Sequence, residues 1–158
     1  MKKILALFIG LFLINGVFAQ IEDDAGALPD KALSYRWKIA TEKVKMLFTF
    51  DKDKKQLYRL ELLEKREKEF KKLIETNRTR FIKDIEYERK NLIYQIDRGI
   101  NTTKKIEVRQ KVLERLQHHT DVLNNITINR QENNKDFDGL RNAINQSSKV
   151  IDRMRRYS

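Results

Sequence analysis

Apolar residues recur every three or four positions along most of the chain, the spacing that places them on one face of an α-helix. The first helix is expected over residues 35–49, capped by Ser34, with an apolar stripe that faces the rest of the protein. The members of this stripe are Trp37, Ala40, Thr41, Val44, Leu47 and Phe48. Phe50 is expected to fill the corner after this helix, and Asp51 to cap the next helix.

Four further segments continue the same spacing. A second helix is expected from Asp51 to about Thr76, and apolar residues then recur from Phe81 to Ile100. The pattern leaves open whether a turn near Asn77 separates these two segments or one long helix runs through both. The apolar positions expected to face inward are Leu57, Leu60, Leu63, Phe70, Leu73, Ile74, Phe81, Ile82, Ile85, Leu92, Ile93, Ile96 and Ile100.

A clearer break falls at residues 99–103, where a glycine is followed by an asparagine and two threonines that suit a new helix start. A helix is expected beyond it to about Ile126, and a last one from Phe137 to Met154 after the polar stretch 129–136. The inward positions expected on these two helices are Ile106, Val112, Leu113, Leu116, His119, Val122, Leu123, Ile126, Leu140, Ile144, Ser147 and Ile151.

These segments and their short connections predict an all-α fold, an up-and-down bundle of four to five amphipathic helices. The composition agrees, because 36% charged residues, five Gly and one Pro are typical of long helices rather than many short strands. We assign residues 34–158 to a single helical domain. The last helix could close its seam on its own bundle or on a second copy, so a homo-oligomer stays open.

The N-terminal stretch has the features of a cleaved signal peptide, assigned to residues 1–19. Lys2 and Lys3 precede an apolar run over residues 4–14, and Val17 and Ala19 supply small residues at the cleavage positions. The run is shorter than the roughly 20 residues that cross a bilayer, so we expect no transmembrane segment in the mature chain. An uncleaved anchor is the alternative. We expect export, to the periplasm, the extracellular space or the cell surface, with residues 20–33 as a flexible lead-in.

The net charge limits which partners the chain can bind, and the lack of cysteine limits which sites it can contain. The chain has 34 Lys and Arg against 23 Asp and Glu, and removing Lys2 and Lys3 leaves a net charge of +9. This balance favours a protein partner or an anionic envelope component such as lipid or surface polymer. The absence of cysteine excludes disulfides, a lipoprotein anchor and thiolate metal sites.

Two patterns resemble metal sites. Asp51 and Asp53 alternate as in a calcium loop, but Gln56 and Leu62 stand where that loop needs Gly and Glu, so we interpret the pair as part of a helix start. His118 and His119 are adjacent and point about 100° apart on a helix, so they cannot chelate one ion together. His119 is expected to be a packed core histidine, and no metal or cofactor is expected.

The sequence also contains no clear signal for a catalytic or nucleic-acid-binding site. Ser34, Ser147, Ser148 and Ser158 lie in caps, helix bodies or the tail, without the strand–turn–helix setting of a nucleophile, so we expect no enzyme. Acids are interleaved with the basic residues and no nucleic-acid-binding signature occurs, so we expect no nucleic-acid partner. Four N-x-S/T acceptor sequences occur, at Asn77, Asn101, Asn125 and Asn145.

Residues 28–69 resemble the start of domain-of-unknown-function family 5667, an uncharacterised prokaryotic family. The resemblance rests on Leu-Pro-Asp at 28–30, Lys38 with Glu-Lys-Val at 42–44, Thr-Phe-Asp at 49–51 and Glu-Lys-Arg at 64–66. Residues 114–126 are similar to a second signature of the family. Arg36 departs from the pattern, because a second proline is common there. The signature positions are Pro29, Trp37, Glu42, Val44, Phe50, Asp51, His119 and Leu123.

The resemblance implies an exported helical domain and supplies no activity, substrate or catalytic residue. Our leading hypothesis is an exported, non-enzymatic helical module with a binding or structural role in the cell envelope. One alternative is a periplasmic-type helical chaperone or stress sensor, although the Leu-Thr-x-x-Gln repeats of such chaperones are missing from this chain. The other is an electrostatic binder of anionic lipid or surface polymer.

Overall fold

A computed structural model of the protein describes residues 28–29, 32–129 and 138–156, so the expected signal peptide lies outside the described residues. Within them the chain forms α-helices and contains no β-strand, which confirms the all-α prediction. The elements are α2 (Ala32–Phe48), α3 (Lys52–Glu75), the 3₁₀ turn η1 (Thr79–Phe81), α4 (Ile82–Ile100), α5 (Ile106–Asn129) and α6 (Asp138–Arg156). None of these helices is both long and apolar enough to cross a membrane.

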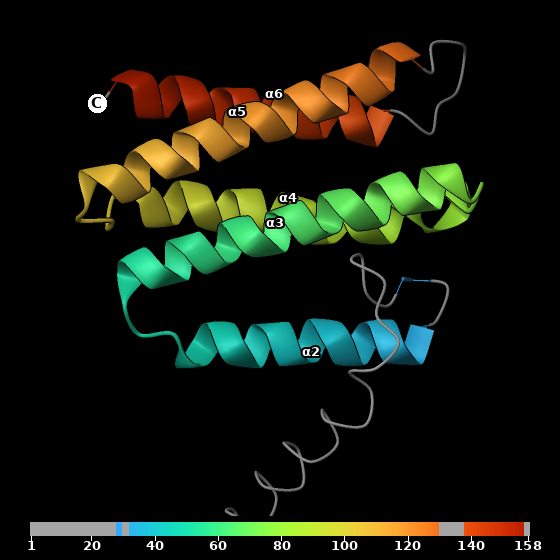
Figure 1. The fold of residues 1–158 in the computed structure, drawn as a ribbon, viewed down its shortest axis with the longest axis horizontal. Coiled ribbons are helices and arrows are strands. Elements are labelled where there is room, and N and C mark those ends of the chain that lie inside the picture. Colours follow the sequence, from blue (N-terminus) through green and yellow to red (C-terminus); the bar gives the residue numbers. More distant parts are fainter. Residues whose placement is uncertain (1–27, 30–31, 130–137, 157–158) are drawn as a thin grey trace, which may run out of the picture.

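Two helical hairpins stack to form a four-helix bundle, and α2 lies outside it (Figure 1). The first hairpin is α3 with α4, and the second is α5 with α6. The hairpins meet through α3 against α5 and α4 against α6, while α2 packs mainly on α3. Leu140 and Ile151 of α6 are buried inside this bundle, so the seam of the last helix closes on its own chain.

Asp51 caps α3 as the sequence predicts. Its Oδ1 accepts a hydrogen bond from the backbone N–H of Lys54 at 2.7 Å, and this bond holds the pKa of Asp51 below its usual range. The expected cap at Ser34 is wrong, because α2 already begins at Ala32 and Ser34 lies inside its first turn. Leu28 and Pro29, assigned to the lead-in, are buried.

A turn at Asn77 ends α3 and answers the question that the sequence left open. Asn77 has a positive φ of 55°, the left-handed conformation that helix C-termini favour. The backbone N–H of Arg78 donates to the carbonyl of Leu73 at 2.8 Å, and that of Asn77 to Ile74 at 3.1 Å. This pair of bonds is a Schellman motif, which satisfies carbonyls at the helix end and reverses the chain into α4.

The core consists of two apolar clusters separated by a polar layer. One cluster gathers residues such as Leu63, Leu92, Leu116 and Val150, and the other gathers Phe70, Ile85, Leu123 and Leu140. Between these levels each helix of the bundle contributes a buried polar side chain. The members of this polar layer are Arg66, Glu67 and Glu69 of α3, Arg89 of α4, His119 and Thr120 of α5, and Ser147 of α6.

Most inward positions of the bundle helices agree with the predicted stripes. Ile106 is an exception, because it is the first residue of α5 and is 71% exposed beyond the end of the bundle. Buried residues that the stripes missed include Leu62 on α3 and Val150 on α6. These positions widen the buried faces to contact two neighbouring helices each, which is expected of helices inside a bundle.

Candidate functional site

The helix α2 turns its less apolar side toward the bundle. Its buried residues are Tyr35, Ile39 and Glu42, and Met46 packs against the first core cluster from a partly buried position. These residues recur three or four apart and so define one inner face. The predicted inward stripe lies on the other side of the helix and, apart from the partly buried Thr41, is exposed, so that prediction is wrong.

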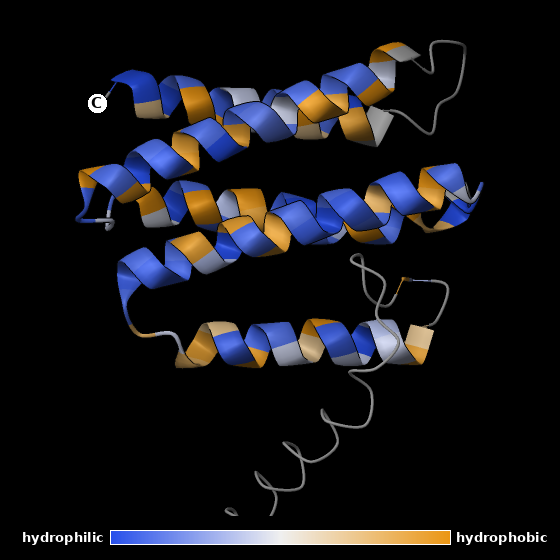
Figure 2. Cartoon of the chain, in the orientation of Figure 1, coloured by the Kyte–Doolittle hydropathy of each residue, from blue (hydrophilic) through white to orange (hydrophobic). Residues whose placement is uncertain are grey.

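The exposed side of α2 carries a continuous apolar surface, which we call the outer face. Its members are Leu33, Trp37, Ala40, Val44, Leu47 and Phe48. Leu47 is 72% exposed and Trp37 is 47% exposed. Figure 2 shows that apolar positions recur over the whole length of this helix. Phe50 extends the surface at the corner, and because it is 84% exposed the expectation that it fills the corner is also wrong.

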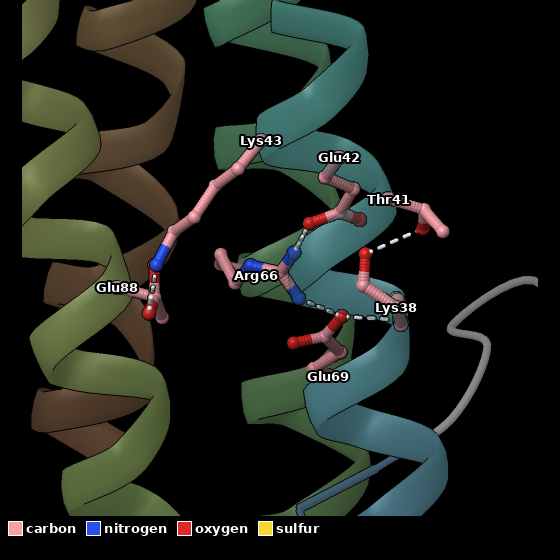
Figure 3. A network of polar contacts seen from close by, with 7 residues as sticks. All are labelled: Lys38, Thr41, Glu42, Lys43, Arg66, Glu69 and Glu88. Atoms are coloured by element: carbon pink, nitrogen blue, oxygen red, sulfur yellow. Dashed lines mark hydrogen bonds and ion pairs between the residues drawn. The ribbon is translucent and has the colours of Figure 1, made fainter. Parts of the chain in front are cut away.

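A buried ion-pair network explains this orientation. Arg66 of α3 is buried between the two helices and pairs with Glu42 of α2 and with Glu69 of its own helix (Figure 3). Lys38 Nζ of α2 lies 2.6 Å from Glu69 Oε1. A buried charge without a partner costs several kcal/mol, so α2 must present Lys38 and Glu42 to α3. Rotating the outer stripe inward would leave Arg66 and Glu69 without these partners.

The electrostatics of the network follow from burial and charge. Burial disfavours the charged form of Arg66, but the carboxylates of Glu69 and Glu42 outweigh it and raise the pKa of the guanidinium. Burial raises the pKa of Glu42, and Arg66 opposes this shift. The guanidinium also lies over the ring of Tyr35, 5.7 Å from its centroid. Arg66 is therefore a permanent positive charge that fixes the position of α2.

A groove of about 530 Å³ runs between α2, α3 and α4. Apolar side chains from all three helices line it, together with charged side chains of both signs, which are Glu42, Lys43, Lys55, Arg59, Arg66 and Glu88. Lys43 Nζ of α2 lies 3.4 Å from Glu88 Oε1 of α4, and Figure 3 shows this pair joining the two helices. The apolar residues that line the groove are Ile39, Met46, Leu47, Leu62 and Leu92.

A second concavity of about 430 Å³, which we call the basic hollow, lies at the corner between α2 and α3, against the end of α4. Among the described residues that line it there is no acid, and Lys55 and Arg59 also line the groove, so the two are continuous. Burial lowers the pKa of Arg59, whose Nη1 donates to Gln56 Oε1 at 2.6 Å. The side chains of the hollow are Phe50, Lys52, Lys55, Arg59, Tyr94, Gln95, Arg98 and Thr102.

His119 lies in the polar layer, 3% exposed, and the prediction of a core histidine is confirmed. Its Nδ1 is 3.0 Å from Glu67 Oε2 of α3, and its Nε2 is 3.2 Å from Arg89 Nη2 of α4. Since a guanidinium can only donate, Nε2 accepts and Nδ1 carries the proton donated to Glu67. Burial lowers the pKa of His119 against the effect of Glu67, so the ring is neutral and both nitrogens are engaged.

Besides Pro29 in the lead-in and Asp51 at the start of α3, the signature residues separate into three places. Trp37, Val44 and Phe50 lie on the exposed apolar surface, while Glu42 lies on the inner face of the same helix. His119 and Leu123 are inside the bundle, one turn apart on α5. The described residues contain no group of three or more His, Asp or Glu side chains able to hold a metal ion. The four asparagines of the N-x-S/T sequences are all exposed.

The sequence interpretation missed Arg66, Glu69 and Arg89, although a signal for two of them exists. Arg66 falls three residues after Leu63 and four before Phe70, inside the apolar stripe of α3. Arg89 falls likewise four residues after Ile85 on α4. A charged residue in the middle of an apolar stripe is either a break in the pattern or a buried charge with a partner, and the structure identifies both as buried.

Comparison with known families gives a match over most of the chain. The family model described as a domain of unknown function (DUF5667) matches residues 26–146, which include α2 and most of the bundle. No curated protein and no solved structure matches the chain.

Proposed function

The chain belongs to the DUF5667 family, and we propose that it is a non-enzymatic binding module of the cell envelope that uses the outer face of α2. The observation that carries the proposal is the orientation of α2. Monomeric soluble domains rarely expose contiguous apolar patches larger than a few hundred Å², and larger exposed patches mark sites of interaction. Here the exposed patch includes a tryptophan, two phenylalanines and three aliphatic residues within and just beyond one helix.

Ion pairs on the inner face of α2 keep its outer face exposed. The network of Arg66, Glu42 and Glu69 holds the inner face on α3, so the outer face does not depend on a conformational change for its exposure. The apolar surface is therefore exposed in the folded domain without any rearrangement of α2. Such a surface also explains why Trp37 and Val44 are signature positions although neither is in the core.

The contacts of His119 inside the bundle support a role without catalysis. His119 has both ring nitrogens engaged by Glu67 and Arg89 inside the bundle, which leaves neither one for proton transfer to a substrate. An envelope location is supported by the leader-like residues 1–19 and by the excess of basic residues.

Photocrosslinking in cells that naturally produce the protein tests the binding module. A benzoylphenylalanine probe replaces Phe48 on the outer face or, as the matched control, the equally exposed Tyr87 of α4. We expect discrete adducts, to protein or to lipid, from position 48 and none from position 87. The same adducts from both positions, or none from position 48, would contradict the proposal. Turnover on a panel of substrates that is abolished by a single polar substitution would contradict its non-enzymatic part.

A holdase chaperone is the second candidate, and the groove beneath α2 favours it. An extended client could lie along the apolar floor of Ile39, Met46 and Leu62, with Lys43 and Lys55 at its edges. This candidate predicts that the protein slows aggregation of an unfolded client at stoichiometric amounts. Aggregation at an unchanged rate would exclude it.

A further inference from the structure

We infer that the outer face of α2 docks on the surface of a bilayer that contains anionic lipid, with the helix axis in the plane of the interface. The inference rests on the proposed binding function and names its partner. It is carried by the arrangement of apolar, aromatic and charged side chains around α2 and at the corner that follows it.

Around the helix axis, the exposed apolar residues occupy one arc, and basic residues lie on both sides of it. Successive residues are about 100° apart, which places Leu33, Val44 and Trp37 near the middle of an arc about 100° wide. Arg36 and Lys43 lie on one side of this arc and Lys45 on the other, all three exposed. The ammonium of Lys45 lies over the ring of Tyr58 on α3, 4.5 Å from its centroid, so this cation flanks the arc from the side nearer the bundle. An apolar stripe bordered by cations is the pattern of helices that lie in a membrane interface.

Acidic side chains near this surface are few, and their carboxylates are engaged by other groups of the chain. The only acid within Ala32–Phe48 is Glu42, which faces inward and pairs with Arg66. At the corner, the carboxylates of Asp51 and Asp53 accept hydrogen bonds from the backbone N–H groups of Lys54 and Lys104. The surface that would meet lipid therefore combines apolar groups with positive charge.

The basic hollow continues the surface at the C-terminal end of α2. Lys52, Lys55 and Arg98 surround the space beside Phe50, and no acid lines it among the described residues. If Phe48 and Phe50 enter the acyl boundary, the hollow comes to the depth of the headgroups. Its cations are then placed to contact lipid phosphates, while Tyr94 offers an amphipathic ring of the kind enriched at that depth.

Charge also decides between lipid and a second copy of the chain. Two copies that met through their outer faces would bring Arg36 and Lys45 of one near the same cations of the other, and like charges oppose such a contact. Lys43 is the exception, because it pairs with Glu88. An anionic bilayer supplies both an apolar interior and the opposite charge. The face is also the convex side of a single helix, which suits a plane of lipids.

Trp37 allows a direct test because it is the only tryptophan of the chain. The full chain is mixed with vesicles of phosphatidylcholine alone or with one quarter phosphatidylglycerol, and tryptophan emission and cosedimentation are measured. We expect a blue shift and quenching by brominated acyl chains with the anionic vesicles only, reversed by raising the salt from about 0.05 to 0.5 M. Insertion of residues 4–14 alone would sediment the protein without moving Trp37 emission.

Two variants and a control locate the contact. Val44→Ser with Phe48→Ser, or Arg36→Glu with Lys45→Glu, should weaken vesicle binding at least tenfold. Tyr87→Ser with Lys90→Glu, on exposed positions of α4, should bind as wild type does. Circular dichroism and thermal unfolding confirm that each variant is folded.

Three results would overturn the lipid assignment. They are unchanged Trp37 emission with anionic vesicles, equal binding to neutral vesicles, and equal binding by the outer-face variants. Unchanged emission together with protein adducts from position 48 would leave the binding module standing with a protein partner. Dimers that disappear in the Val44→Ser, Phe48→Ser variant, without vesicle binding, would assign the face to a second copy.

Discussion

Glu42 of α2 and Arg66 of α3 form a buried ion pair, and this pair determines which side of α2 meets the bundle. The two residues are 24 positions apart in sequence and come from helices joined by a tight corner at Asp51. Because Glu42 must face Arg66, the apolar stripe on the other side of α2 faces outward.

The orientation of α2 predicts unequal costs for two aliphatic truncations on the same helix. Ile39→Ala should lower the free energy of unfolding by about 2 to 4 kcal/mol, because Ile39 is buried on the inner face. Val44→Ala should change it by less than about 0.5 kcal/mol, because Val44 is on the outer face. Urea unfolding followed by circular dichroism measures both. A larger loss for Val44→Ala than for Ile39→Ala would mean that α2 faces the other way.

Removing the guanidinium of Arg66 should be far more costly than removing an exposed one. Arg66→Met leaves Glu42 buried without its partner and Glu69 with Lys38 alone, and we expect the free energy of unfolding to fall by about 3 kcal/mol or more. Arg115→Met is the control, because its pair with Glu64 at 2.7 Å is exposed, and we expect less than about 1 kcal/mol. Chemical unfolding of the two variants side by side measures the difference, and equal losses would contradict the buried network.

The neutral state of His119 predicts that stability falls with acid. Its pKa in the folded protein lies below the usual value near 6.5, so between that value and the lowered one only the unfolded chain binds the proton. The free energy of unfolding should therefore fall as the pH drops through 6.5, by at most about 1.4 kcal/mol for each pH unit, and be fully retained above it.

His119→Gln separates this effect from other titrating groups. The amide of Gln can donate to Glu67 and accept from Arg89, and it does not titrate. We expect the variant to lose the part of the slope that begins below pH 6.5, while His118→Gln, at the exposed neighbour, keeps the slope of the wild type. Parallel stability curves for His119→Gln and wild type would show that the histidine is not held neutral.

The left-handed conformation of Asn77 predicts opposite effects for two small residues. Asn77→Ala should destabilise the protein by about 1 kcal/mol, because a Cβ is disfavoured at positive φ without the local hydrogen bonds of asparagine. Asn77→Gly should leave stability equal or raise it, since glycine is preferred at this position of the Schellman motif. Asn125→Ala, on an exposed position inside α5, is the control and should be neutral or slightly stabilising. Thermal unfolding ranks the three.

The sequence contained more of the polar layer than its periodicity alone revealed. The apolar stripes of α3, α4, α5 and α6 are each interrupted at one level, by Arg66, Arg89, His119 and Ser147 respectively. A histidine or a serine is a polar residue that can be buried within an apolar stripe, so His119 and Ser147 were both expected to face inward. The two arginines were not, because a charge inside a core is stable only beside partners that lie far away in sequence.

The sequence by itself determined the helices, the cap at Asp51, the inner faces of the four bundle helices and the buried place of His119. These features depend on the spacing of residues within one helix or at one helix end, so they are local. The tertiary structure alone decided the orientation of α2, because both sides of that helix carry apolar residues at helical spacing. The choice between them was made by Glu42 and Lys38 meeting Arg66 and Glu69, a pairing that exists only once α2 and α3 are neighbours.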